Sequence, residues 1–433
     1  MSIATPSTST AVSPDSSSSS TGPLAVVTTL FFMWGFLTCL NDILVPHLKP
    51  IFDLNYAEVM LIQFAFFGAY FLFSIPSAKV IDWIGYQRSM VVGLLTMGAG
   101  AFLFVPAASV PSFPLFLVAL IVLAAGITCL QVAANPYVTV LGKPETASSR
   151  LNLTQAFNSL GTFLAPFFGG LLILSAAPRT MEEIRSLAPD ALQAYRLHEA
   201  ATVKTPYVGL GIALVVLAIA IGSFKLPKIP HAQHKVGEKV NDSIWKHRNL
   251  ILGAIGIFVY VGAEVSIGSF LVNYFSQPEI GGLTEKVAAS FVAFYWGGAM
   301  VGRFIGSGLL QTMKTGRLLG ICAVCAAALV AISMLSTGHF AMWSIILVGF
   351  FNSIMFPSIF TLGVAELGPL TGDGSGIMIM AIVGGALIPI AQGAIADRIG
   401  IHHAFFLPVI CYLYILFFAV SGSKPNSERP VRS

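Results

Sequence analysis

Charged side chains are scarce in this sequence of 433 residues. Asp, Glu, Lys and Arg make up 10% of it, whereas a soluble domain carries about 25%. Hydrophobic residues make up 56% and the mean hydropathy is +0.83. Apolar runs of the ~20 residues that cross a bilayer recur along the chain. The composition therefore excludes an ordinary soluble protein and predicts a helical protein that crosses the membrane many times.

Several functional signatures are also missing. The first 23 residues contain no Lys or Arg and no apolar stretch, so we expect a disordered tail there rather than a secretory signal. The five cysteines lie in apolar runs, and the Cys322–Cys325 pair has no second Cys/His pair to complete a metal site. HExxH and GxSxG motifs are absent. We expect no enzyme activity, no cofactor and no metal, and the net charge of +4 does not indicate a nucleic-acid partner.

The apolar runs predict an all-α membrane protein of twelve spans. Residues 1–23 form the predicted N-terminal tail, 24–226 a first six-helix bundle, 227–247 a polar linker, 248–422 a second six-helix bundle and 423–433 a C-terminal tail. The predicted spans are 24–53, 56–82, 88–107, 111–141, 148–175, 204–226, 248–276, 285–312, 316–336, 339–365, 374–397 and 402–422.

The basic residues predict the orientation. With the N-terminus inside, fifteen Lys and Arg fall in inner segments and seven in outer segments, with Arg303 near a helix end. Cytoplasmic loops carry the excess of Lys and Arg. We therefore expect both termini in the cytoplasm and the protein in the plasma membrane, the inner membrane of a bacterium.

The two halves repeat. Gly161, Pro166 and Gly170 form the pattern G-x4-P-x3-G, which recurs 223 residues later from Gly384. Pro136 in span four has a counterpart 221 residues later in Pro357 of span ten. Two matches at nearly one offset predict two parallel six-span repeats, the architecture of major facilitator transporters, in which substrate is held near the midplane between the halves.

Two carboxylates stand inside predicted spans. A charge at the bilayer centre costs roughly 2.5–3.5 kcal/mol on insertion scales, so it normally marks a transport pathway. Asp42 follows Asn41 in span one, and Glu264 shares a helix face with Tyr260 in span seven. The structural alternatives are a helix cap for Asp42 and a buried ion pair for Glu264. We predict that both couple transport to a cation.

Amides and aromatics cluster in four other spans, and they predict a sugar site. Amides donate to and accept from hydroxyl groups, while an aromatic ring stacks on the apolar face of a pyranose. Packing between helices is the alternative for each residue. The candidate substrate-binding residues are Asn41, Gln131, Asn135, Gln155, Asn158, Tyr260, Asn273, Tyr295, Trp296 and Asn352.

Two loops resemble the signature G-x-[LI]-x-D-[RK]-x-G that facilitator transporters carry at their gates. The first is Asp82-x-x-Gly85-x-x-Arg88, between spans two and three. The second is GAIADRIG at 393–400, with Asp397 and Arg398. Together with Arg303, these are the predicted gating residues.

Longer stretches make the resemblance specific. LNDILVPHLKPIF, QVAANPYVTVLG, RLNLTQAFNSLG, KTPYV, YVGAEVSIGSFLVNYF and FPSIFTLGVAELG resemble the fucose–galactose–glucose:proton symporter family, and together they lie across residues 24–422. The resemblance implies a monosaccharide symporter in which Asp42 is a coupling carboxylate and Gln155 and Asn158 line the sugar cavity.

The chain departs from fucose-type members at two positions. Those members carry a Glu where this chain has Gln131, and an amide where it has Glu264, as though one carboxylate had crossed the cavity. The ILQVAANP form of glucose/galactose-type members is closer to this sequence. We expect a monomeric importer of a hexose such as glucose or galactose, coupled to protons. N-acetylglucosamine as substrate, sodium as coupling ion, and drug or metabolite antiport remain alternatives.

Overall fold

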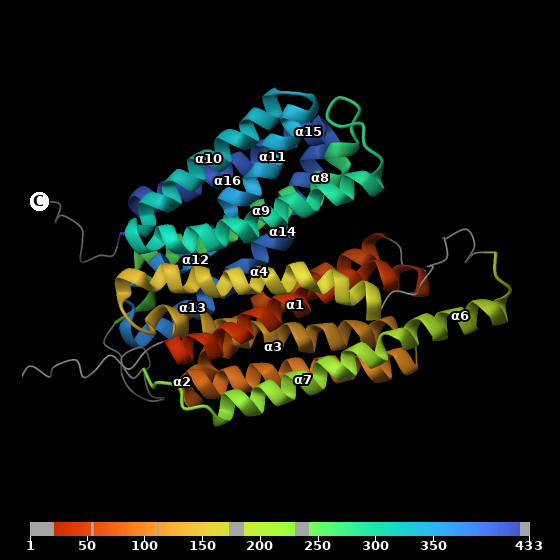
Figure 1. Ribbon diagram of the computed structural model, residues 1–433, viewed down its shortest axis with the longest axis horizontal. Helices are drawn as coiled ribbons and strands as arrows, with labels where there is room; N and C mark the ends of the chain where they lie inside the picture. Colours follow the sequence, from red (N-terminus) through yellow and green to blue (C-terminus); the bar gives the residue numbers. More distant parts are fainter. Residues whose placement is uncertain (1–20, 53–55, 111, 173–185, 230–241, 425–433) are drawn as a thin grey trace, which may run out of the picture.

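The computed structural model describes residues 21–52, 56–110, 112–172, 186–229 and 242–424, and every long element in these ranges is a helix (Figure 1). The side chains of residues 40–60, 63, 166–172 and 200 lie outside the described part. The first half contains α1 (Thr21–Phe52), α2 (Tyr56–Ser109), α3 (Phe113–Val140), α4 (Ala147–Leu172), α6 (Pro189–Thr202) and α7 (Lys204–Ser223).

The second half repeats this arrangement with more breaks. It contains α8 (Arg248–Ser276), α9 (Glu285–Thr312), α10 (Thr315–Leu335), α11 (Gly338–Asn352), α12 (Met355–Gly363), α13 (Thr371–Met380), α14 (Gly384–Ile399), α15 (Ile401–Ala404), α16 (Phe406–Phe417) and the π-helical turn η6 (Phe418–Gly422).

The twelve-span prediction agrees with these helices. Ten helical stretches among the described residues are long and apolar enough to cross a membrane. One of them, Phe64–Ser109, contains parts of two predicted spans that meet at Gly85, whose backbone (φ 81°, ψ 167°) is not helical. That conformation is essentially restricted to glycine. The remaining predicted span is α4, whose C-terminal part lies at the edge of the described residues.

Three features differ from the predicted boundaries or fall outside them. Helix α1 begins at Thr21, inside the predicted tail. The predicted outer loop before span six contains α6, because Pro189 at the first helical position and the helix-forming residues after it favour a helix. Residues 1–20, most of the linker at 230–241, and 425–433 lie outside the described residues.

The glycine repeat has the same packing role in both halves. A Cβ on Gly161 would overlap the backbone carbonyl of Phe32 in α1, and a Cβ on Gly384 would overlap that of Phe258 in α8. Both glycines therefore let a later helix of their half approach the backbone of its first helix closely. The sequence repeat corresponds to a repeated helix contact.

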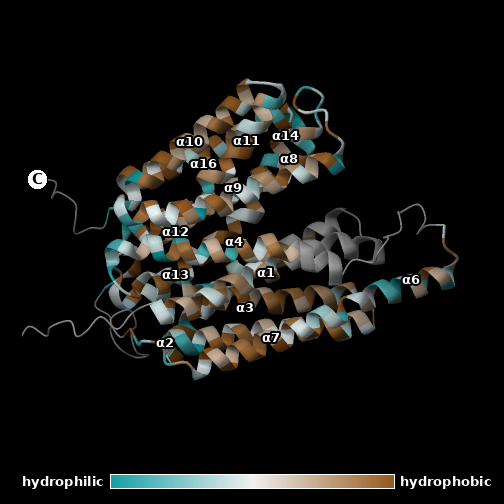
Figure 2. Ribbon diagram, in the orientation of Figure 1, coloured by the Kyte–Doolittle hydropathy of each residue, from teal (hydrophilic) through white to brown (hydrophobic). Residues whose placement is uncertain are grey.

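The halves meet at one end of the molecule and diverge toward the other (Figure 1). Contacts join α4 to α9 and α12, and α13 to α2 and α3. Hydrophobic residues cover the outer helix faces (Figure 2), where large side chains such as Leu72, Ile219 and Leu413 are more than half exposed. Such faces suit lipid rather than water, so the chain is a multi-pass membrane protein.

Candidate functional site: amides, tyrosines and a buried carboxylate between the halves

Glu264 lies at the centre of a polar cluster in the second half. Its Oε1 atom accepts a hydrogen bond from the Tyr260 hydroxyl at 2.7 Å, one helical turn earlier on α8. The Tyr260 hydroxyl also lies 3.1 Å from the backbone oxygen of Asn352. The Arg303 guanidinium on α9 is near enough to attract the Glu264 carboxylate electrostatically. A tyrosine and a nearby cation therefore surround a carboxylate that is only 9% exposed.

Each half holds an amide on a tyrosine hydroxyl. Gln131 Nε2 on α3 donates to the Tyr70 hydroxyl on α2 at 2.8 Å, and Asn352 Nδ2 on α11 donates to the Tyr295 hydroxyl on α9 at 2.9 Å. The two amides are 221 residues apart and the two tyrosines 225 apart, which matches the offsets of the repeat. The same contact is therefore built twice, once on each side of the molecule.

Residual exposure separates these residues into two groups. Gln131 and Gln155 are 6% exposed and Glu264 is 9% exposed, whereas Asn135, Asn352 and Tyr295 are completely buried. The buried residues hold the others in place. Asn135 Oδ1 accepts a long bond of 3.4 Å from Gln155 Nε2, and the Tyr295 hydroxyl donates to the backbone oxygen of Glu264 at 3.3 Å.

Two of the buried amides keep an unused polar atom. Asn135 Nδ2 and Asn352 Oδ1 have no hydrogen-bond partner among the described residues. The buried Tyr412 hydroxyl of α16, near Asn352, also lacks one there. An unpaired buried polar group costs roughly 1–3 kcal/mol. Such a cost at the midplane of a transporter is expected where a polar substrate or a moving proton must be accommodated.

Two prolines free carbonyl groups beside the site. A proline inside a helix cannot donate to the carbonyl four residues earlier. Pro136 leaves the Val132 carbonyl free, and this oxygen accepts a bond from the Ser375 hydroxyl of α13 in the other half at 2.8 Å. At the equivalent place, Pro357 leaves the Ser353 carbonyl free, and it accepts from Arg303 Nε at 3.3 Å. The break between α11 and α12 falls at Ser353–Ile354, directly after Asn352.

Arg303 joins the two halves. Besides Ser353, its guanidinium donates to the backbone oxygen of Gln155 at 3.3 Å and to the hydroxyl of Ser159, both on α4. The backbone oxygen of Arg303 in turn accepts from Asn152 Nδ2 at 2.7 Å. Arg303 therefore bridges α9 and α4 while its charge acts on Glu264.

Further contacts close the end at which α4 and α10 begin, which we call the closed end. Lys79 Nζ lies 2.8 Å from Asp373 Oδ1 in the other half and 3.4 Å from Asp82 Oδ2 in its own. The Ser148 hydroxyl lies 2.6 Å from that of Thr361 and accepts from Thr315 at 2.9 Å. These contacts hold the halves together on one side of the site.

The remaining predicted residues occupy separate positions. Trp296 is 40% exposed, and its ring lies edge-on to Tyr295 with centroids 5.1 Å apart. Asn158 donates to the Phe31 carbonyl of α1 at 2.9 Å, so its amide also joins two helices. Asn273 is exposed, about 13 Å along α8 from Glu264 at 1.5 Å per residue. Asn41 and Asp42 lie in α1, but their side chains are outside the described part.

The two predicted gating loops differ in position. Asp82 contacts Lys79 at the closed end, where Gly85 breaks the helix and Arg88 is exposed. Asp397 and Arg398 are exposed at the opposite end of the α13–α14 span. Within the described ranges they make no hydrogen bond or ion pair with the first half. The structure therefore does not bring this second loop to the contacts between the halves.

The sequence analysis missed Tyr70, Ser375 and Tyr412. Tyr70 could have been found, because it stands at the repeat offset from Tyr295. Ser375 and Tyr412 had no such signal, because serines and tyrosines in apolar helices are common and only the fold brings these two to Val132 and Asn352.

Two pseudo-symmetric helical bundles that meet around a buried polar cluster define a membrane transporter of the alternating-access type. Residues 25–382 match the Major Facilitator Superfamily model, and the chain belongs to that superfamily.

Named relatives place the chain in a smaller group. It is 55% identical to the glucose/galactose transporter of Brucella abortus biovar 1 (strain 9-941), over 93% of this chain and 94% of that protein. It is 35% identical to the L-fucose-proton symporter of Escherichia coli K12, over 92% of each. A crystal structure of the E. coli fucose:proton symporter FucP in the outward conformation superposes with a TM-score of 0.84 at 34% identity, covering 92% of this chain and 97% of that one.

Proposed function

We propose that this chain imports a monosaccharide by cation symport, with a glucose- or galactose-type hexose as substrate and the proton as coupling ion. The relatives named as glucose/galactose and fucose-proton transporters support the substrate class. The observation that carries the proposal is the pair of tyrosine-held amides facing each other from the two halves, next to Glu264.

The amides suit a sugar better than an apolar drug. A hydroxyl both donates and accepts, and an amide offers both functions. Gln131 and Gln155 retain some exposure and are the proposed contacts in the first half, while exposed Trp296 offers a ring face in the second. Asn135 and Asn352, which are fully buried, hold those contacts in register. An antiporter of apolar compounds would gain little from this many amides.

Glu264 and Asp42 are the proposed coupling groups. A carboxylate in an apolar surrounding favours its protonated form, so it takes up a proton readily when its cavity opens to the more acidic side. Neutral Glu264 leaves Arg303 attached to α4, whereas ionised Glu264 attracts Arg303 toward α8. Release of the proton would therefore weaken the contact between the halves.

The closed end is proposed to face the cytoplasm, as the excess of Lys and Arg near the termini indicates. The sugar then enters from the opposite side, and import requires the Arg303 and Lys79 contacts to break. The similarity to FucP in its outward conformation supports the same reading. We further propose the inner membrane of a bacterium as the location.

The test of transport is counterflow into proteoliposomes. Vesicles loaded with millimolar unlabelled glucose are diluted into trace labelled glucose, without any ion gradient. We expect transient accumulation of the label, and competition by galactose stronger than by fucose, N-acetylglucosamine or an uncharged drug. Competition by the drug alone would favour the antiporter. No counterflow with any sugar would reject the proposal.

Arg303 provides a prediction about the gate. Because its guanidinium donates to Gln155, Ser159 and Ser353, Arg303→Gln removes charged hydrogen bonds worth about 1.5–3 kcal/mol each. We expect the fraction of molecules open at the closed end to rise about tenfold or more. Double electron–electron resonance between spin labels at positions 143 and 314 measures this fraction, in a background with the five cysteines replaced by serine.

Arg248→Gln is the matched control, because Arg248 is exposed at the start of α8. It is expected to leave the distance distribution unchanged. If Arg303→Gln leaves the short distance as dominant as in the parent protein, Arg303 does not hold the gate.

A further inference from the structure

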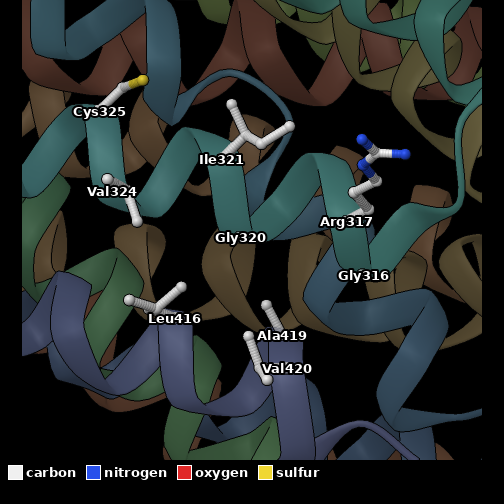
Figure 3. Close-up of a pocket in the computed structure, with 9 residues that line it drawn as sticks. All are labelled: Gly316, Arg317, Gly320, Ile321, Val324, Cys325, Leu416, Ala419 and Val420. Atoms are coloured by element: carbon white, nitrogen blue, oxygen red, sulfur yellow. The ribbon is translucent and has the colours of Figure 1, made fainter.

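A groove runs between α10 and the end of the second half, away from the polar cluster. Its volume is about 490 Å³, and it is lined on one side by residues of α10 from Gly316 to Cys325 and on the other by Leu416, Ala419 and Val420. Figure 3 shows Arg317 and Gly316 at one end of the groove and Val324 and Cys325 at the other. Arg317 is the only charged residue in the lining.

The groove faces the surroundings of the protein. Ile321 and Val324 are 45% and 48% exposed, and Val420 is 63% exposed. They lie on helices that are long and apolar enough to span a membrane. Lipid chains therefore contact these residues in a bilayer.

The backbone shapes the floor of the groove. A Cβ on Gly316 would stand 2.9 Å from the Ala419 carbonyl, so the two helices nearly touch at the charged end. Farther along, a Cβ on Gly320 would be 3.7 Å from Ala419 and Leu416. The π-helical turn η6 supplies Ala419 and Val420, with the Ser423 amide bonded to the Phe418 carbonyl at 2.8 Å. Such turns are rare and frequently occur at functional sites.

The charge at the narrow end has one sign. Lys314 precedes Gly316 by two residues and Lys424 follows Val420 by four, and Arg317 lies between the helices. Residues 313–337 and 401–424, which form both walls, contain no Asp or Glu. An apolar groove that ends in cations complements a lipid whose chain lies along the helices and whose phosphate lies at Arg317. Basic pockets between membrane helices bind anionic headgroups.

We propose that this groove binds one anionic phospholipid, of the phosphatidylglycerol type, from the leaflet at the closed end. Its acyl chain lies on Gly316, Gly320 and Val324, and Arg317 contacts its headgroup. A lipid wedged between α10 and η6 would stabilise the second half next to Thr315, which bonds to Ser148 across the gate.

The test is native mass spectrometry of the purified full chain, titrated with phosphatidylglycerol and separately with phosphatidylcholine of the same acyl chains. We expect one phosphatidylglycerol to bind at least fivefold more tightly than phosphatidylcholine. Arg317→Gln should weaken this binding about fivefold, which corresponds to the roughly 1 kcal/mol of one basic residue near a membrane surface. Gly320→Leu should fill the groove and weaken both lipids.

Two matched variants serve as controls. Lys225→Gln removes an exposed cation of the first half, and Gly308→Leu adds the same side chain on α9, where a Cβ meets nothing within 4 Å. Both should bind phosphatidylglycerol like the parent. Equal binding of the two lipids would overturn the proposal. So would an Arg317→Gln protein that binds as tightly as Lys225→Gln, since Arg317 is exposed and its replacement should not disturb folding.

Discussion

Uphill sugar accumulation is expected to disappear in Glu264→Gln, while sugar exchange remains. Glutamine has nearly the same shape, and its Oε1 can still accept the bond from Tyr260, but it cannot carry a proton. A single coupled proton at 100 mV supplies about 2.3 kcal/mol, which sustains a ratio of about 50-fold. The variant should equilibrate near a ratio of one. Labelled hexose uptake and counterflow in the same proteoliposomes separate the two activities.

Glu279→Gln is the matched control, because Glu279 is exposed just after α8 and the chemical change is identical. It should accumulate sugar normally. Asp42→Asn should behave like Glu264→Gln. If Glu264→Gln still accumulates sugar, Glu264 serves only as a buried partner for Arg303 and the coupling role assigned to it is wrong.

Moving the carboxylate across the cavity extends this test. Gln131→Glu combined with Glu264→Gln restores the arrangement that fucose-type members carry. The Tyr70 hydroxyl can donate to a carboxylate as readily as it accepts from the amide. Part of the accumulation should therefore return in the double variant. No recovery would mean that the two positions are not interchangeable in coupling.

Sugar affinity is expected to fall 10- to 100-fold in Gln155→Leu, with little loss of stability. The side-chain amide of Gln155 is 6% exposed and makes only a 3.4 Å bond to Asn135, so the fold depends little on it. A sugar hydroxyl that loses a buried partner costs about 1–3 kcal/mol. Substrate-dependent thermal shifts report affinity, and the shift-free melting temperature reports stability.

Asn249→Leu makes a comparable change at a structural amide. Asn249 Nδ2 lies 3.1–3.2 Å from the carbonyl oxygens of Leu362, Gly363 and Ala365, which it ties to α8. It should lower the melting temperature without weakening sugar binding. If Gln155→Leu instead resembles Asn249→Leu, with lower stability and unchanged affinity, Gln155 supports the helices and does not contact the sugar.

The spans and the repeat could be predicted from the sequence because both depend on local patterns. Apolar runs fix helix positions, and the glycines at 161 and 384 appear wherever two helix backbones touch. The extra helix α6 was missed because its residues are polar and its helix-forming tendency was outweighed by the absence of an apolar run.

The partners inside the site could be predicted only in part. Helical spacing correctly placed Tyr260 next to Glu264. The bonds from Gln131 to Tyr70 and from Ser375 to Val132 join residues 61 and 243 positions apart, and only the fold brings such pairs together. The state of the gate is not a property of local sequence at all, because the same Arg303 must hold the halves in one state and release them in the other.

The most direct test of cation-coupled sugar import is labelled glucose uptake into proteoliposomes with an inward proton gradient and no sodium. We predict accumulation above the outside concentration that a protonophore abolishes. Accumulation that begins only when sodium is added would contradict proton coupling, and Asp42 and Glu264 would then be ligands of a sodium ion.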